Sequence, residues 1–181
     1  MYDLRYLQRR VLRKELTMAI TEEIISLTAE IHRALRDRNE TLSTAESITA
    51  GGLSNALTIV PGASEVFLGG AAAYHPSIKV SLLGVSEETI AKHSVFSQEV
   101  AVEMAQGALK RFGTTWAIAT TGVAGPGPTD GSAAGSVWVA IAGPINQTME
   151  LDLAGEREVV RNATIASAIA SFARILRHRK N

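Results

Sequence analysis

The chain has no cysteine, few aromatic residues and no excess of either charge. Without cysteine it forms no disulfide, binds no metal through thiolates and has no cysteine nucleophile. Its 18 basic residues balance 18 acidic ones, which argues against a nucleic-acid binder that works by bulk positive charge. No apolar run approaches the length of a membrane span, and the N-terminus lacks the apolar core of a secretory signal. We therefore expect a cytoplasmic protein with no nucleic-acid or membrane partner.

What is present is typical of one globular domain. The 181 residues are 46% hydrophobic and 20% charged, and they are enough to bury a full core. Residues 1–17 carry more basic than acidic side chains, so we interpret them as a basic N-terminal extension. Residues 18–181 are expected to form a single domain, because no internal repeat and no long linker divides them.

Hydrophobic periodicity predicts alternating helices and strands. Helical spacing of apolar residues indicates helices at about 22–38, 53–60, 77–83, a short one after Ser86, 98–112 and 156–177. Short apolar runs indicate strands at about 41–45, 68–74, 116–121, 136–142 and 147–153, of which the last two form an antiparallel hairpin. This order predicts an α/β fold, a three-layer α/β/α sandwich around a mixed, mainly parallel sheet.

The stretch Thr44-Ala-Glu-Ser-Ile-Thr-Ala-Gly-Gly-Leu joins the first strand to a helix. A turn of this kind directs backbone N–H groups and the positive end of a helix dipole toward a ligand. Ser47 is placed there as a candidate nucleophile, because these N–H groups can stabilise an oxyanion beside it. The alternative is that Ser47 or Thr49 only caps the helix.

Two further strand ends carry polar residues, and strand ends are where open α/β sheets bind ligands. Tyr74-His75, close to Lys79, follows the second strand, and Thr120-Thr121-Gly122 follows the third. The glycine-rich loop 122–131 can approach a ligand closely, but it fits neither common nucleotide motif and is equally compatible with a long turn.

A serine nucleophile needs a base. His75 and His93 have no neighbouring acidic residue to orient them, so we interpret both as surface or structural histidines. Lys79 becomes a base if burial lowers its pKa toward neutrality, although a lysine shortly after a proline is more often solvated. No set of histidines and carboxylates has the spacing of a metal site, so no metal is expected.

Five motifs in this order resemble the C-terminal domain of CinA, the competence/damage-inducible protein. They are Ala45-Glu-Ser-Ile-Thr-Ala-Gly, Val60-Pro-Gly-Ala-Ser, Gly69-Gly with Tyr74 and Lys79, Leu82-Leu-Gly-Val, and Thr120-Thr-Gly-Val-Ala-Gly-Pro. The resemblance covers about residues 24–177. Stand-alone members of that family are nicotinamide-nucleotide amidases, so it implies hydrolysis of nicotinamide mononucleotide to nicotinate mononucleotide and ammonia, without metal or cofactor. It also implies a homo-oligomer, and no activity of the larger CinA domain is carried over.

The family's serine–lysine pair falls on Ser47 and Lys79, with Thr121 as a third catalytic candidate that relays or orients the proton. The backbone N–H groups of residues 48–52 are the expected oxyanion donors. Tyr74 either faces the cationic pyridinium ring or is a plain core tyrosine. Glu46 orients the site or pairs with Lys79, and a tight pair would raise the lysine pKa and oppose its role as base. The residues expected to bind substrate are Glu46, Thr49, Gly51, Tyr74, Gly122, Ala124 and Gly125.

The chain departs from the family pattern in four places. Ile48 replaces a common cysteine, and Ala50 replaces a usual glycine, which is tolerable if φ is negative there. His75-Pro76 replaces Ser-Asn, and residues 132–137 lack a lysine that would help to bind phosphate. Two alternatives to the nucleotide amidase therefore stay open, a non-catalytic nucleotide-binding module and an amidase acting on another small amide.

Overall fold

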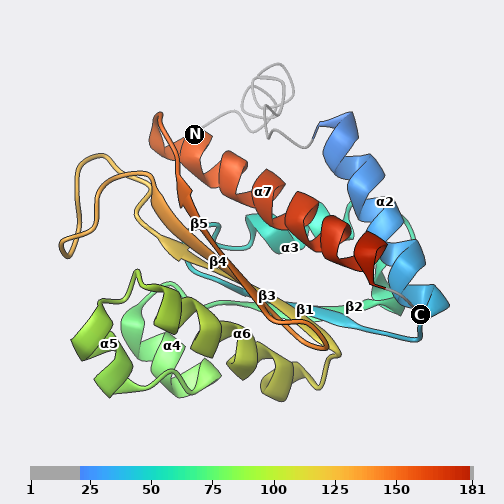
Figure 1. Cartoon of the computed structure of the whole chain (residues 1–181), viewed down its shortest axis with the longest axis horizontal. Helices are drawn as coiled ribbons and strands as arrows, with labels where there is room; N and C mark the ends of the chain where they lie inside the picture. The colour runs from blue at the N-terminus through green and yellow to red at the C-terminus, as the bar shows by residue number, and fades with distance from the viewer. Residues whose placement is uncertain (1–20, 180–181) are drawn as a thin grey trace, which may run out of the picture.

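A computed structural model describes residues 21–179, which fold into one five-stranded sheet with helices on both faces (Figure 1). The strand order is β2-β1-β3-β4-β5. β1 pairs in parallel with β2 and β3, whereas β4 is antiparallel to both of its neighbours, so four of the five strands run in one direction. The strands are β1 (Leu42–Glu46), β2 (Phe67–Ala72), β3 (Trp116–Gly122), β4 (Ser136–Ala142) and β5 (Gln147–Asp152).

Within the described part of the chain, three helices cover each face of the sheet (Figure 1). On one face lie α2 (Glu22–Asp37), α3 (Gly52–Thr58) and α7 (Arg157–His178). On the other lie α4 (Pro76–Leu83), α5 (Glu87–His93) and α6 (Gln98–Phe112), and a 3-10 turn, η1 (Ala63–Glu65), precedes β2. The connection from β1 to β2 crosses the first face and the connection from β2 to β3 crosses the second. The three parallel strands therefore end at the same edge of the sheet.

Capping residues explain where several helices begin and end. The hydroxyl groups of Thr21, Ser86 and Ser97 accept hydrogen bonds from backbone N–H groups in the first turns of α2, α5 and α6. Gly84 and Gly113 end α4 and α6 in the left-handed conformation that glycine adopts without strain. Local side-chain chemistry thus sets these boundaries, which is why the sequence predicts them closely.

The sheet separates two hydrophobic cores. The larger one joins α2, α3 and α7 to the sheet, and in it Trp116 packs edge-on against Phe172 with ring centroids 5.3 Å apart. The smaller one is rich in alanine and joins α6 and the ends of α4 to the opposite face. The indole N–H of Trp116 donates to Glu40 at 2.7 Å, and Arg179 pairs with the same carboxylate. This contact ties the end of α7 to the segment that leads into β1.

The expected fold class is confirmed, including the mixed sheet and the antiparallel β4–β5 hairpin. The basic extension 1–17 lies outside the described residues, and the division at residue 18 stays a prediction. One expectation needs correction, because α7 is long and apolar enough to pass as a membrane span by composition. A row of its residues is buried in the larger core, however, as in the core helix of a globular protein.

Candidate active site

Three chain segments meet at the edge where the parallel strands end. Glu46, the last residue of β1, pairs with Ala72 of β2 on one side and with Thr120 of β3 on the other. Ser47 therefore follows at the position between Ala73 and Thr121, and its N–H group donates to the carbonyl of Thr120 at 2.9 Å. The sheet register thus holds the candidate nucleophile in the central of three adjacent chain segments.

The alternation of side chains along the strands sets the direction of the site. Ala45 and Ala119 belong to the smaller core, on the face covered by α4 and α6. Thr121 lies two residues further along β3, and Ser47 directly follows the end of β1, so continued alternation would direct both toward the same face. The Thr121 hydroxyl donates to the carbonyl of Val95 at 2.9 Å, in the segment between α5 and α6. Ser47 is 5% exposed, so its hydroxyl lies at the base of a recess and not on the open surface.

Lys79 enters this face from α4 and is completely buried. Its Nζ atom donates to the carbonyl of Ala73 at 2.8 Å. Ala73 directly follows the register pair Ala72–Glu46, so the amine lies beside the chain segment next to Ser47, although among the described residues no hydrogen bond joins it to the Ser47 hydroxyl. Burial lowers the pKa of Lys79 to about 8, because an apolar environment disfavours the charged ammonium. Within residues 21–179 no carboxylate lies within 4 Å of this amine, so the considered Glu46–Lys79 pair does not form.

Glu46 instead caps α3 from the opposite face of the sheet. Its carboxylate accepts the N–H groups of Gly51 (2.9 Å), Leu53 (2.9 Å) and Ser54 (2.8 Å), together with the Thr49 hydroxyl at 2.7 Å. The suggestion that Ser47 or Thr49 caps the helix is therefore wrong. The positive end of α3 is already neutralised by a carboxylate.

The occupied N–H groups also correct the expected oxyanion donors. The N–H of Gly51 donates to Glu46, and the N–H of Gly52 donates to the carbonyl of Thr49 at 3.0 Å. The amides of residues 48–50 have no protein acceptor among the described residues, and they remain as candidate donors. Gly51 thus shapes the turn and binds Glu46, and its N–H does not face a substrate.

The turn after Ser47 has an unusual backbone. Ala50 has φ +48°, and Gly51 follows with φ +93°. The condition under which Ala50 would be tolerated, a negative φ, is not met, since this residue adopts the left-handed conformation that favours glycine. A non-glycine residue there is strained by roughly 1 kcal/mol.

A cavity of about 260 Å³ opens beside Ser47. It is lined by Ser47, Ile48, Tyr74, Phe96, Gly122, Val123, Ala124, Gly125, Thr129 and Arg157. The glycine-rich loop therefore forms a wall of the recess and is more than a long turn. Tyr74 is 56% exposed at the mouth, which rules out a core tyrosine. Five of the residues predicted for the site line this recess: Ser47, Tyr74, Gly122, Ala124 and Gly125. The other predicted residues are not among those that line it: Glu46, Thr49, Gly51, Lys79 and Thr121.

Comparison with known proteins identifies the family. Residues 24–176 match the model of the CinA C-terminal domain. The chain belongs to the CinA C-terminal domain family. A CinA-like protein of Prochlorococcus marinus is 48% identical over 139 residues, 75% of this chain and 33% of that protein. One of Thermotoga maritima is 38% identical over 149 residues, 82% of this chain and 36% of that protein. The chain thus spans about a third of the length of the curated relatives it matches.

Solved CinA structures share the fold closely. The crystal structure of the competence damage-inducible protein A from Klebsiella pneumoniae superposes with a TM-score of 0.83 at 36% identity, covering 87% of this chain and 99% of that one. A CinA superfamily protein from Escherichia coli gives a TM-score of 0.80 at 32% identity, covering 90% and 93%. The sheet that carries the Ser47 recess is therefore the family's own architecture.

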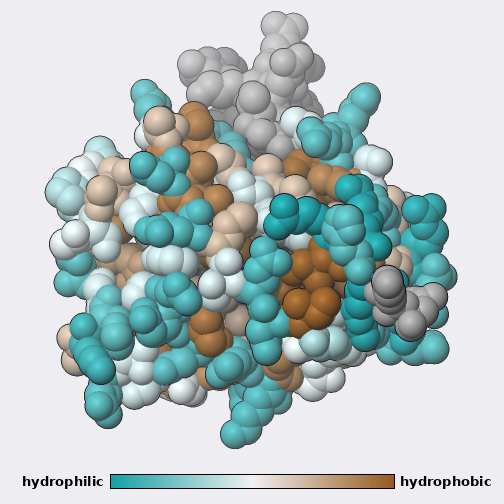
Figure 2. Space-filling model, in the orientation of Figure 1, coloured by the Kyte–Doolittle hydropathy of each residue, from teal (hydrophilic) through white to brown (hydrophobic). Residues whose placement is uncertain are grey.

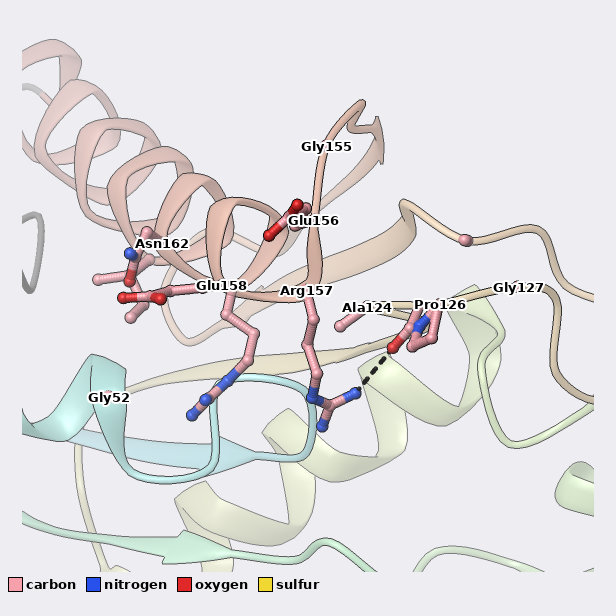
Figure 3. Close-up of a pocket in the computed structure, with 13 residues that line it drawn as sticks. Gly52, Ala124, Pro126, Gly127, Gly155, Glu156, Arg157, Glu158 and Asn162 are labelled. Carbon is pink, nitrogen blue, oxygen red and sulfur yellow. Dashed lines mark hydrogen bonds between the residues drawn. The ribbon is translucent and has the colours of Figure 1, made fainter.

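Two arginines of this CinA domain complete the site, and the sequence did not predict either. Arg157, the first residue of α7, extends toward the loop that carries Ala124 and Pro126 (Figure 3). Its guanidinium donates to the carbonyl of Gly125 at 3.2 Å and to the Tyr74 hydroxyl at 2.7 Å. Arg161, one turn later, donates to the carbonyls that follow Ser47. Arg157 places a cation in the first turn of α7, where it opposes the helix dipole. That unfavourable placement was the feature of the sequence that could have marked Arg157 as a functional residue.

A second cavity of about 770 Å³ adjoins the recess. Ala124, Gly125 and Arg157 line both cavities, so Arg157 lies at the boundary between them. Figure 3 shows Arg157 among the residues that line the larger one. The histidines considered as bases have other roles. His75 accepts the N–H of Ser77 and caps α4, and the ring of His93 lies 3.6 Å from Glu99.

Proposed function

We propose that this CinA domain hydrolyses the carboxamide of nicotinamide mononucleotide to nicotinate mononucleotide and ammonia. The observation that carries the proposal is Lys79, a fully buried amine whose pKa is lowered to about 8 and which lies at the strand position next to Ser47. A buried lysine without a counter-charge destabilises a fold. Its neutral form is a competent general base for a serine hydroxyl.

In the proposed reaction, neutral Lys79 accepts the Ser47 proton while the serine oxygen attacks the carboxamide carbon. The tetrahedral oxyanion is stabilised by free amides of the turn at residues 48–50. Its collapse breaks the C–N bond, and Lys79 returns the proton to the departing ammonia. Water then attacks the resulting ester, again with Lys79 as base, and releases the carboxylate product and the free Ser47 hydroxyl. No metal or cofactor enters these steps.

The cavity shapes support a mononucleotide substrate. The 260 Å³ recess suits a pyridine ring and its carboxamide, and the adjoining 770 Å³ cavity has room for ribose phosphate. Arg157 at the boundary supplies a cation for the phosphate and compensates for the lysine missing from residues 132–137. The exposed Tyr74 ring is placed to pack against the cationic pyridinium.

An ammonia-release assay with three amides tests the proposal. Nicotinamide mononucleotide, nicotinamide riboside and nicotinamide are each offered to the wild-type chain, to Ser47→Ala and to Arg157→Met. We expect turnover of the mononucleotide, loss of at least 10³-fold in Ser47→Ala, and a raised KM in Arg157→Met.

The same assay separates the alternatives. Turnover of none of the three by folded wild-type protein would favour a non-catalytic nucleotide-binding module. Turnover of the riboside or the free amide alone would indicate an amidase for another small amide. Full activity of Ser47→Ala would remove the serine from the mechanism. A cytoplasmic location and a homo-oligomer remain expectations that accompany this proposal.

A further inference from the structure

We propose that Arg161 is a positioning residue that fixes the turn carrying Ser47. This inference deepens the proposed amidase and rests on it for its kinetic consequences. Arg161 is half-buried in the second turn of α7, and its Nε and Nη2 atoms donate to the carbonyls of Ile48 at 3.0 Å and Thr49 at 2.9 Å. Ile48 and Thr49 are the two residues that directly follow Ser47.

The turn needs external support because its own backbone is strained. Ala50 and Gly51 are consecutive residues in the left-handed region, and such a conformation persists only where the surroundings hold it. Glu46 accepts the N–H groups on the far side of the turn, and Arg161 binds its carbonyls on the near side. The Glu46 carboxylate bound to the N–H groups and the Arg161 guanidinium bound to the carbonyls thus hold the turn from two sides.

Arg161 also sets the direction of two free amides. In a planar trans peptide the C=O and N–H groups point in opposite directions. When Arg161 binds the carbonyls of Ile48 and Thr49, the N–H groups of Thr49 and Ala50 must point away from α7. Neither amide donates to a protein acceptor within residues 21–179. A guanidinium bound to the carbonyl side increases the positive character of both N–H groups.

The placement of Arg161 has no alternative explanation in an ion pair. No carboxylate within the described chain lies within 4 Å of its guanidinium, although Glu158 is one turn away on the same helix. It lies in the second turn of α7, beyond the first turn in which the helix dipole acts most strongly. Its hydrogen bonds to the Ser47 turn are therefore the contacts that hold its guanidinium, and since Arg161 also lines the cavity of about 770 Å³, the test must separate positioning from substrate binding.

The kinetic test compares Arg161→Met and Arg161→Lys with a matched control, Arg174→Met, on an exposed position of the same helix. We expect kcat to fall about 10- to 100-fold in Arg161→Met with KM changed less than about 3-fold, because a displaced turn impairs the reaction more than binding. Arg161→Lys retains the charge but not the two parallel donors of a guanidinium. Its kcat should therefore lie between that of the wild type and that of Arg161→Met. A third variant, Arg161→Ala, leaves space for a free guanidinium ion, and adding that ion should partly restore its kcat.

A second readout does not depend on activity. In ¹H–¹⁵N spectra of the whole chain, the amide signals of residues 48–51 should shift in Arg161→Met and keep their positions in Arg174→Met. Unchanged amide signals would overturn the proposal, whether or not any amide is hydrolysed. A raised KM with unchanged kcat would also overturn it, since Arg161 would then act as a substrate-binding cation. If the wild type hydrolyses none of the three amides, the proposed function fails while the spectra still decide the role of Arg161.

Discussion

The Nζ atom of Lys79 donates a hydrogen bond of 2.8 Å to the carbonyl oxygen of Ala73. Ala73 follows Ala72, the register partner of Glu46, and Ser47 follows Glu46. A neutral amine that donates one hydrogen to this carbonyl keeps its lone pair free for a proton from Ser47. The backbone therefore orients the base without adding a negative charge that would raise its pKa.

Replacing Lys79 by methionine should abolish amide hydrolysis and stabilise the fold. The buried amine has a pKa of about 8 in the folded chain against 10.5 when solvated, so at neutral pH its protonation favours the unfolded state. We expect a gain of order 1–3 kcal/mol in the free energy of unfolding at pH 7, measured by urea denaturation. Between about pH 8 and 10.5 the amine is protonated in the unfolded chain but neutral in the folded chain. The stability gained by Lys79→Met should therefore decrease across this range and vanish above it.

Lys110→Met, on an exposed position of α6, is the matched control and should change stability by less than about 0.5 kcal/mol. A Lys79→Met variant that is less stable than wild type at pH 7 would show that the amine stabilises the fold.

The rate of hydrolysis should rise with pH. Only neutral Lys79 accepts the serine proton, and with a pKa of about 8 roughly a tenth of the molecules carry the neutral form at pH 7. We expect kcat/KM to increase nearly tenfold per pH unit below pH 8 and to level off above it, with the same inflection in His93→Gln. A flat profile between pH 6 and 9 would contradict the role of Lys79 as base.

Ala50→Gly should stabilise the chain. Ala50 has φ +48°, and glycine adopts that conformation without the clash of a Cβ atom. We expect about 1 kcal/mol of added stability by thermal unfolding. The matched control is Ala170→Gly on the exposed side of α7, which should cost about 1 kcal/mol because glycine disfavours a helix interior. A destabilised Ala50→Gly variant would show that the turn tolerates alanine without strain.

His32 makes the stability of the larger core pH-dependent. The ring is completely buried, and neither nitrogen has a hydrogen-bond partner among the described residues. Burial lowers the pKa of His32 from its ordinary value, because the apolar core disfavours the charged ring. The unfolded chain therefore binds more protons than the folded chain below about pH 6.5. As the pH is lowered below that value, the free energy of unfolding should decrease by up to about 1.4 kcal/mol per pH unit.

His32→Leu removes this titration and should flatten the profile between pH 6.5 and 5, as followed by urea denaturation. His178→Gln, on an exposed turn of α7, should leave the dependence of the wild type unchanged. A profile equally steep in His32→Leu would assign the pH dependence to other groups.

Most of the fold could be predicted from the sequence because its signals are local. Serine or threonine caps, glycine stops and apolar spacing place most helix and strand ends within a few residues of the observed ones. The positions of Ser47 and Thr121 at one edge of the sheet were also predictable, because the carboxyl ends of parallel strands share that edge.

The rest of the site depends on contacts between distant segments. A pair with Lys79 was one of two roles considered for Glu46, but strand alternation turns its side chain to the opposite face, where it reaches α3. Arg157 and Arg161 follow Ser47 by more than a hundred residues, and only the packing of α7 above the turn brings them to it. The sign of φ at Ala50 is set by the tertiary fold and has no signature in the side chain.

The capping of α3 by Glu46 has a consequence for product release. In the proposed reaction the neutral carboxamide leaves as an anionic carboxylate, which an open helix end would retain. Here a resident anion already occupies that end, so the new negative charge gains nothing by staying. If the proposed reaction holds, we therefore expect nicotinate mononucleotide to inhibit only weakly, because of the side chain that precedes the nucleophile.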